Sequence, residues 1–452
     1  MVLDKKSFSR NVAEAFAWSS AGSWIIRVVG IFTTVLVLAQ FSLRDYGTYQ
    51  LVLAAWGLLF SFSLQGVDQI VVAEGARITG KDEYAAVLLG QGYFLFKLFS
   101  SAILFTLLYL GAHILSGWYS LDIVSLLKVL SLSFIAVPFE RLINYHLARH
   151  LKFFQTSLYT VLEEVSKFVL IAVVLLLFHF RIGAVLAATA LSAIGTMIVF
   201  IPIVPRKYFY FSRHSLSSLF HLIIVRHGKW NIFQKYIRQT EKNIRPIFVE
   251  YFIGREGVAL FSVAEKLFNT FADLFPISDV LTPILSTELE NRARLQRTLE
   301  RVFKYTFPLL AIISTVVALV APFILAYAFP QYIPALSLFN ILLFYIPFLG
   351  LGYTLTSLYF SQREQKEAFY LILIRFGLYV VTAPLLLKTL GLWGVAIEYS
   401  ATLIFFDILR YWSLVRIHPE LTMRFGHLFS VDGYDRAVLL KIKSRLLRRF
   451  SP

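Results

Sequence analysis

Cysteine is absent from the 452 residues of this chain. Its absence excludes disulfide bonds, thiolate metal sites and cysteine nucleophiles. Charged residues are scarce too, at 15%, while 58% of all residues are hydrophobic; soluble globular proteins contain ~45–50% apolar residues. Apolar runs of about 18 residues or more recur along the whole chain, as membrane-spanning helices require. The sequence therefore predicts an all-α polytopic membrane protein.

Acidic residues are in the minority, because 27 Asp and Glu stand against 43 Lys and Arg, giving a net charge of +16. Nucleic-acid-binding proteins can carry such a charge, but no nucleic-acid-binding module accompanies it here. We therefore expect no nucleic-acid partner. Membrane proteins collect Lys and Arg on their cytoplasmic loops, and this explains the excess.

Motifs for catalysis and metal binding are missing as well. The stretch from Gly75 to Asp82, GARITGKD, nearly matches a phosphate-binding loop, but Asp82 replaces the Mg²⁺-binding Ser or Thr and no strand precedes it. His146 and His150 have the i, i+4 spacing of a metal pair on a helix, yet no third ligand is nearby. No nucleophile and base form a catalytic arrangement. The sequence predicts a protein that is not an enzyme and that uses neither metal nor cofactor.

About twelve transmembrane helices can be read from the apolar runs. They are expected at about 17–40, 46–70, 86–112, 122–144, 155–178, 183–204, 229–252, 258–284, 304–328, 334–360, 368–387 and 392–415. The first run is long and lacks a small-residue cleavage site, so we expect a retained helix and not a signal peptide.

Basic residues fix the orientation of these helices. With the N-terminus in the cytoplasm, the outer loops contain only Arg44, Arg181, Arg255 and Lys388. The inner segments contain the remaining loop clusters, including the arginine-rich loop at 292–301 and the basic tail. The positive-inside rule therefore predicts that both termini are cytoplasmic.

The run at 229–252 is unusual because one helical face is polar. That face carries Asn231, Gln234, Lys235, Arg238, Glu241, Lys242 and Arg245. If this helix did not cross the membrane, every later loop would change sides and the positive-inside rule would fail, so we expect it to span. Each Lys or Arg facing lipid at the centre of a span costs ~2.5–3.5 kcal/mol. These cations must therefore face water, a bound anion or partner carboxylates; Glu241, Glu265 and Asp273 keep the ion-pair alternative open.

Other spans add polar groups. Arg27 shares a helical face with Ser20, Ser23, Gly30 and Thr34. Lys97 and Lys167 lie within apolar runs, with Glu163 as the expected partner of Lys167. Arg375 lies in the eleventh span and Glu398 in the twelfth. Together these groups predict a water-filled, mainly cationic central cavity between two helix bundles.

A weak internal repeat supports two bundles. FSLRDYGTYQLVLA at 41–54 aligns without gaps with IGREGVALFSVAEK at 253–266, which places Gly47 over Ala259 and Tyr49 over Phe261. Both segments are expected in the outer loop before an even-numbered helix. Six helices per half is an even number, so the two halves are expected to point the same way. The predicted domains are an N-terminal lobe at 1–210, a C-terminal lobe at 211–416 and a basic cytoplasmic tail at 417–452.

These features resemble the multidrug/oligosaccharidyl-lipid/polysaccharide exporter superfamily, and within it the Wzx-type polysaccharide flippases. The resemblance rests on LRDYGTYQ at 43–50, on GREGVALFSVAEKL at 254–267, on the eighth-helix run that ends at Pro283 and on the arginine-rich inner loop. Leu43 and Ala259 depart from the Pro and Gly that are usual in the family. The two-lobe layout covers nearly the whole chain.

The resemblance implies a flippase that moves undecaprenyl-diphosphate-linked oligosaccharides across a bacterial cytoplasmic (inner) membrane by alternating access. The product would feed surface polysaccharide synthesis, such as O-antigen of lipopolysaccharide. Implied partners are this substrate, membrane lipids, and polysaccharide polymerase and chain-length proteins. The cationic face fits such a substrate, since Arg binds phosphate bidentately and Lys provides a compact charge.

We therefore hypothesise an anion-binding surface and a separate ion-coupling site. The expected substrate-binding residues are Arg27, Lys97, Lys235, Arg238, Lys242, Arg245 and Arg375. The ion-coupling candidates are Glu265, Asp273 and Glu398, since intramembrane carboxylates often carry protons. Three other functions stay open: a multidrug or small-molecule exporter, a lipid II flippase of the same superfamily, and an integral-membrane polysaccharide polymerase.

Overall fold

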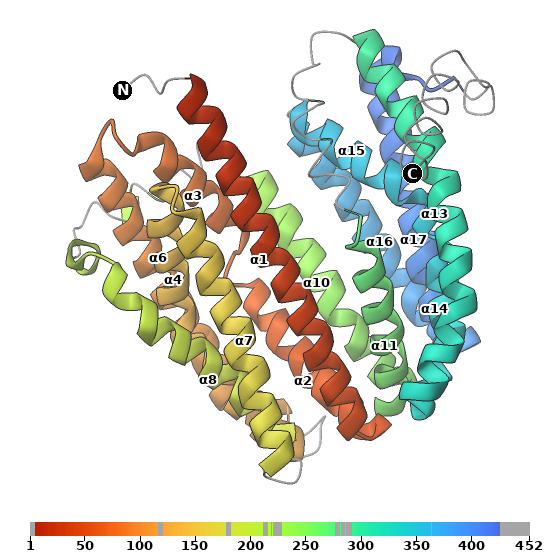
Figure 1. The fold of residues 1–452 in the computed structure, drawn as a ribbon. Helices are drawn as coiled ribbons and strands as arrows, with labels where there is room; N and C mark the ends of the chain where they lie inside the picture. The colour runs from red at the N-terminus through yellow and green to blue at the C-terminus, as the bar shows by residue number, and fades with distance from the viewer. Residues whose placement is uncertain are drawn as a thin grey trace, which may run out of the picture. The chain divides into compact units, whose positions relative to one another are not determined.

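The computed structural model describes residues 5–115, 121–177, 182–210, 216–217, 219, 228–275, 281, 285, 292–362 and 364–424. Within these ranges the regular structure is entirely helical (Figure 1). The α-helices before residue 210 are α1 (Lys5–Gln40), α2 (Leu43–Ser61), α3 (Gly66–Ile78), α4 (Glu83–Leu115), α5 (Leu121–Ser131), α6 (Ser133–Arg149), α7 (Phe153–Leu177) and α8 (Ile182–Phe200). The α-helices from residue 228 onward are α10 (Gly228–Ile253), α11 (Arg255–Ala272), α13 (Arg292–Ala328), α14 (Ala335–Leu343), α15 (Leu349–Ser361), α16 (Gln365–Leu390) and α17 (Leu392–Ile417).

The prediction of a polytopic all-α membrane protein is confirmed. Eight of the described helices are long and apolar enough to cross a membrane, and the bent pair α2 and α3 makes up to nine. Three further described helices, α7, α10 and α11, are 25, 26 and 18 residues long but carry more charge. That these three helices also cross, which would give the expected twelve spans, stays a prediction. Pro283 and the tail beyond residue 424 lie outside the described residues.

Two compact units make up the structure. The first contains Met1–Ala264, Ile324–Leu338 and Ile372–Val395, and the second contains Glu265–Phe323, Phe339–Leu371 and Ala396–Pro452. The division into lobes at 1–210 and 211–416 stays a prediction.

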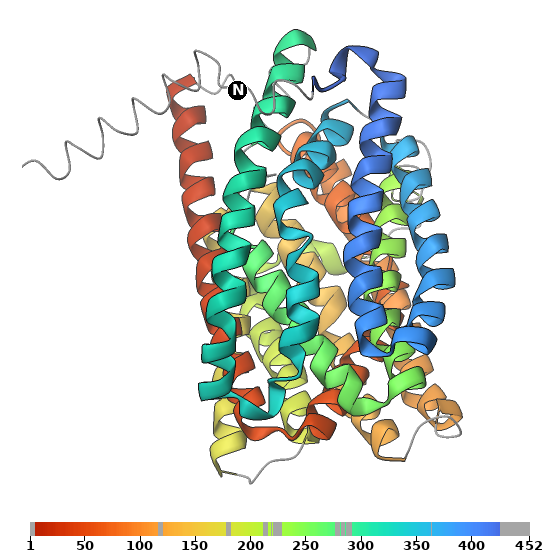
Figure 2. The same cartoon turned by 90° about the vertical axis from the view of Figure 1, so that its right-hand side faces the viewer.

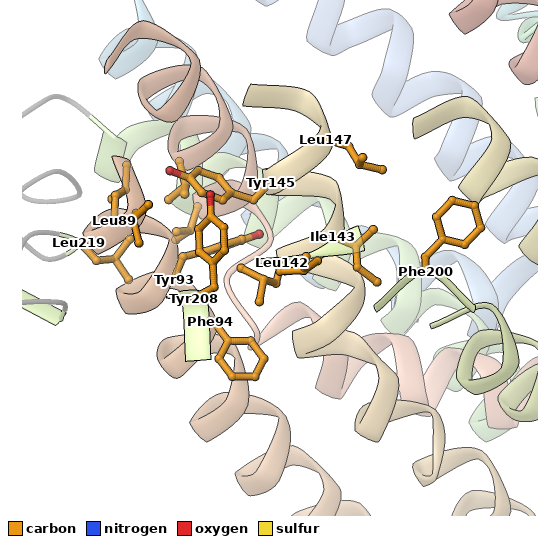
Figure 3. Close-up of a cluster of buried hydrophobic side chains, with 14 of the residues drawn as sticks. Leu89, Tyr93, Phe94, Leu142, Ile143, Tyr145, Leu147, Phe200, Tyr208 and Leu219 are labelled. Carbon is orange, nitrogen blue, oxygen red and sulfur yellow. The ribbon is translucent and has the colours of Figure 1, made fainter. Parts of the chain in front are cut away.

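One hydrophobic core cluster of the first unit lies among α3, α4 and α6. Tyr93, Tyr145 and Tyr208 are completely or almost completely buried here, and their rings pack beside Leu142 and Phe94 (Figure 3). The Tyr145 hydroxyl donates a hydrogen bond to the Ala86 carbonyl at 2.6 Å, which satisfies its one polar group. Elsewhere in this unit α1, α7 and α8 run side by side (Figure 1).

Helix α10 packs on α2 and α3 within the first unit. The approach is close enough to require glycine. A Cβ on Gly66 would lie 2.5 Å from Ile232 Cα, and one on Gly47 would lie 1.9 Å from the Arg255 carbonyl oxygen. The predicted repeat segments therefore meet each other, because Gly47 and Arg255 belong to the two copies. Gly254, at φ +100°, ends α10 and lets α11 begin at the next residue.

The second unit is built on α13, α15 and α17. Figure 2 shows α13 and α17 as long helices of this unit. Gly350 at the start of α15 contacts Thr306 on α13, where a Cβ would lie 1.9 Å from the threonine hydroxyl. Tyr359 on α15 donates a hydrogen bond to the Arg410 carbonyl on α17 at 3.0 Å. These contacts fix α15 between its two neighbours.

Substituting Gly66 tests the close packing of α3 on α10. Gly66→Ala should lower the free energy of unfolding by ~1–3 kcal/mol, since the new methyl group meets backbone that cannot move aside. Gly195→Ala is the matched control, because nothing lies within 4 Å of the added Cβ on α8. Thermal unfolding of the purified proteins in detergent measures the difference. Equal midpoints for the two variants would contradict the packing.

Candidate functional site

The region of the expected second span contains a break between two helices, which the sequence did not predict. Helices α2 and α3 meet at an angle of 51°. Leu64 between them has φ +51°, a left-handed conformation that costs free energy for a residue other than glycine. A break of this kind leaves backbone carbonyls at the end of α2 without helical partners, so other groups must satisfy them.

Lys97 of α4 stabilises this break. Its ammonium group donates a hydrogen bond to the Ser63 carbonyl at 2.8 Å and lies 2.7 Å from the Asp68 carboxylate. Lys97 is 0% exposed. Its charge is well placed, because cations are favoured at the C-terminal end of a helix and anions, here Asp68, in the first turn of the next one.

Asp68 also joins two further helices. Arg141 on α6 places its Nε 3.5 Å from the second Asp68 oxygen and its Nη1 3.6 Å from Glu140. Lys235 on α10 is half-buried and lies within electrostatic range of Asp68 and Arg141. This Asp68 cluster therefore contains two of the predicted substrate-binding residues, Lys97 and Lys235.

A second charged cluster lies between α10 and α16. Glu241 Oε1 accepts hydrogen bonds from Arg245 at 3.2 Å and from Arg375 at 2.5 Å. Glu241 and Arg245 are both 2% exposed. The Arg245 guanidinium lies 5.2 Å from the centre of the Tyr379 ring, which adds a cation–π contact. The ion-pair alternative therefore holds for these residues in the described structure.

The remaining predicted substrate-binding residues are more accessible. Arg238 and Lys242 are exposed on consecutive turns of α10, one turn before the buried Arg245. Arg27 on α1 is half-buried, with its guanidinium 5.9 Å from the Trp24 ring. The assignment of all seven cations to substrate binding stays a prediction.

The expected partner of Lys167 was wrong by one residue. Lys167 pairs with Glu164 at 2.6 Å, three residues earlier, and not with Glu163. Both spacings bring side chains together on a helix, so the sequence could not choose between them. Glu163 lies within electrostatic range of Lys167 and also of Glu140 and Arg141, beside the Asp68 cluster.

The three ion-coupling candidates differ in their surroundings. Glu398 on α17 is 1% exposed and accepts a hydrogen bond from the Thr402 hydroxyl at 2.7 Å. Glu265 is half-buried and Asp273 is exposed. Their role in ion coupling stays a prediction.

Sequence reasoning missed a network within the second unit. Asp407 is 1% exposed and accepts hydrogen bonds from the Tyr345 hydroxyl at 2.9 Å and from Arg410 at 3.3 Å. Arg410 also donates to the Thr356 hydroxyl at 2.8 Å. The available signal was the i, i+3 spacing of Asp407 and Arg410 inside an apolar run.

At the end of α6, His150 is bonded to a salt-bridge group. Arg149 is buried and pairs with Glu83 at 2.5 Å, and Lys207 lies 3.0 Å from the same carboxylate. Arg149 Nε donates a hydrogen bond to His150 Nε2 at 3.1 Å. Burial, and then the charge of Arg149, lowers the pKa of His150. These contacts connect α4, α6 and the segment after α8.

The fold is similar to that of solved membrane transporters. The chain is similar to a structure described as the inward-facing conformation of a multidrug resistance MATE family transporter of the MOP superfamily, with a TM-score of 0.73, 17% identity, and coverage of 87% of this chain and 95% of that one. It is also similar to the lipid II flippase MurJ in an inward closed conformation, with a TM-score of 0.74, 14% identity, and coverage of 96% and 93%. The chain therefore shares the fold of these two solved transporters.

The particular family follows from the sequence. The family model for "Polysaccharide biosynthesis protein" matches residues 37–334, and the chain belongs to this family. A curated relative, the teichuronic acid biosynthesis protein TuaB of Bacillus subtilis (strain 168), is 21% identical over 197 residues, which is 43% of this chain. The match spans 39% of that protein's own length. The resemblance to polysaccharide exporters of this superfamily is thus confirmed.

A double-mutant cycle tests whether Lys97 and Asp68 support the break. Lys97→Met alone should lower the free energy of unfolding by ~3–5 kcal/mol, since it leaves buried charge and a carbonyl unsatisfied. The Lys97→Met/Asp68→Asn double variant should lose less than the sum of the single losses. Detergent unfolding curves provide the measurement, and Lys242→Met at an exposed position is the control. Equal stability of Lys97→Met and Lys242→Met would exclude the supporting role.

Proposed function

We propose that this protein is a flippase that moves undecaprenyl-diphosphate-linked oligosaccharides from the cytoplasmic to the outer leaflet of a bacterial inner membrane. The observation that carries the proposal is the placement of Arg238 and Lys242. They are exposed on consecutive turns of a helix that packs inside a membrane protein of the polysaccharide biosynthesis family. Two cations on one face need an anionic or aqueous partner, because lipid cannot solvate them.

A lipid-linked diphosphate matches this chemistry. Its headgroup is anionic and polar, so both phosphates and sugars need a wet surface lined by cations. Arg238 provides a planar fork that can bind a phosphate bidentately, and Lys242 provides a compact charge. Arg27, half-buried on α1, is a further contributor in this proposal. The lipid tail stays in the bilayer throughout.

The cycle follows alternating access between two parallel lobes. The protein moves its substrate without changing it chemically, so the function is transport and not catalysis. Glu398, Glu265 and Asp273 are the proposed sites of ion coupling, of which Glu398 is the most deeply buried. Both termini are cytoplasmic in this proposal, and a polysaccharide polymerase and chain-length proteins act on the product.

The leaflet that holds the lipid-linked oligosaccharide tests the function directly. Cells lacking the protein should accumulate complete repeat units on the cytoplasmic face and lose surface polymer. Single repeat units on the outer face would instead indicate a polymerase. Unchanged lipid-linked intermediates would exclude polysaccharide export and favour a small-molecule exporter.

Neutralising the exposed pair on α10 tests the proposed binding surface. Arg238→Gln/Lys242→Gln should reduce export at least ~10-fold at normal protein level, since each contact to a charged phosphate contributes ~1.5–3 kcal/mol. Arg245 is left intact because its removal would unbalance the buried Glu241. The charge-matched control is Lys366→Gln/Lys388→Gln, at exposed positions near the two ends of α16. Surface polymer in the complemented deletion strain is measured, and full export by the first variant would exclude the assignment.

A further inference from the structure

Glu241 is bonded to both arginines of the second charged cluster, Arg245 and Arg375. One oxygen, Oε1, accepts from Arg245 at 3.2 Å and from Arg375 at 2.5 Å. The other oxygen, Oε2, is buried and makes no hydrogen bond with any residue that the structure describes. Two guanidinium groups therefore converge on a single acceptor atom.

This arrangement has the chemistry of an anion site that is filled from within the chain. Guanidinium groups bind carboxylates and phosphates through the same donor geometry. A carboxylate offers one negative charge, whereas a diphosphate offers more charge and more acceptor oxygens. Phosphate groups reaching Arg245 and Arg375 would therefore replace Glu241 with a stronger partner.

The site lies next to the exposed cations on the same helix. Lys242 follows Glu241 directly, and Arg238 lies one turn before it. The side chain of Arg375 is 16% exposed and the side chain of Glu241 is 3% exposed, so Arg375 is the more accessible of the two. An anion held by Arg238 and Lys242 thus lies within one helical turn of the buried cluster.

Arg245 has a support that does not depend on Glu241. Its guanidinium lies 5.2 Å from the centre of the Tyr379 ring. Tyr379 in turn stacks on Phe248, with ring centres 5.9 Å apart and planes at 14°. Because these rings hold the guanidinium, Arg245 can keep its position when the carboxylate moves away.

We infer that Glu241 is an internal substitute for the substrate's diphosphate, which neutralises Arg245 and Arg375 in the empty protein and is displaced when a phosphate group binds. The inference rests on the proposed function, since it adds a specificity residue to the same anion site. Glu241 acts here as a competitor of bound anions for Arg245 and Arg375. Anions with too little negative charge to displace Glu241 therefore bind weakly. The same competition allows the substrate to be released after transport.

Binding of inorganic pyrophosphate to the purified full-length protein in detergent tests this role. Glu241→Gln should bind pyrophosphate at least about tenfold more tightly than the unmodified protein, because a negative charge adjacent to the anion is removed. Arg375→Gln should bind more weakly. Glu250→Gln is the matched control on the same helix, where the carboxylate contacts Arg255 at 3.6 Å, and it should bind as the unmodified protein does. Titration calorimetry gives the affinities.

A second measurement uses the unmodified chain and so does not depend on the stability of a variant. Labelling of carboxylates by a water-soluble carbodiimide and an amine, read by mass spectrometry, should increase at Glu241 when pyrophosphate is added and stay constant at Glu250. Constant labelling at Glu241 with pyrophosphate bound would overturn the inference.

The outcomes separate this inference from the proposed function. If the unmodified protein binds pyrophosphate, Arg238→Gln/Lys242→Gln loses that binding and Glu241→Gln changes nothing, the anion site stands and the role of Glu241 is rejected. If neither the unmodified protein nor Glu241→Gln binds pyrophosphate, the anion site itself is rejected and the inference with it.

Discussion

The break between α2 and α3 depends on one ammonium group. Lys97 is fully buried, and a buried charge is tolerated only when close partners replace the water it has lost. The Ser63 carbonyl and the Asp68 carboxylate provide this replacement at 2.8 and 2.7 Å. The ion pair therefore does more than join two charges. It satisfies the end of one helix, complements the start of the next and keeps Leu64 in a conformation that it would otherwise avoid.

The same rule applies to three arginines elsewhere in the chain. Arg245 and Arg375 share Glu241, and Arg410 is held by Asp407 and by the Thr356 hydroxyl. In each case the cation has a carboxylate partner from the same unit. Such pairing lets apolar helices carry charge without exposing it to lipid, and it keeps the geometry of each pair specific, since removing one partner leaves the other unsatisfied.

Helix α10 carries both buried, paired charges and exposed charges. Its buried residues contact α2, α3 and α16, while Arg238 and Lys242 on neighbouring turns are exposed. Close packing at Gly66 brings α10 near the Asp68 cluster, and Lys235 adds its charge there. A single helix thus connects the electrostatics of the broken span with that of the Glu241 cluster. Under the proposed function, α10 is the element through which an anionic substrate would affect both.

The sequence by itself determined the class of structure and the location of the unusual helix. Apolar runs identify membrane-spanning helices because lipid accepts little else, and the polar stripe at 229–252 is visible because helical periodicity places its residues on one face. The sequence also favoured exporters of this superfamily through the motifs at 43–50 and 254–267. Only the tertiary structure decided which charges are paired. Asp68 and Lys97 are 29 positions apart and Glu241 and Arg375 are 134 apart, as the numbering shows, so no local rule joins them. Helix periodicity gives the face of a side chain, but its partner depends on which helix packs against that face, and on the break at Leu64 that turns α3 toward α4.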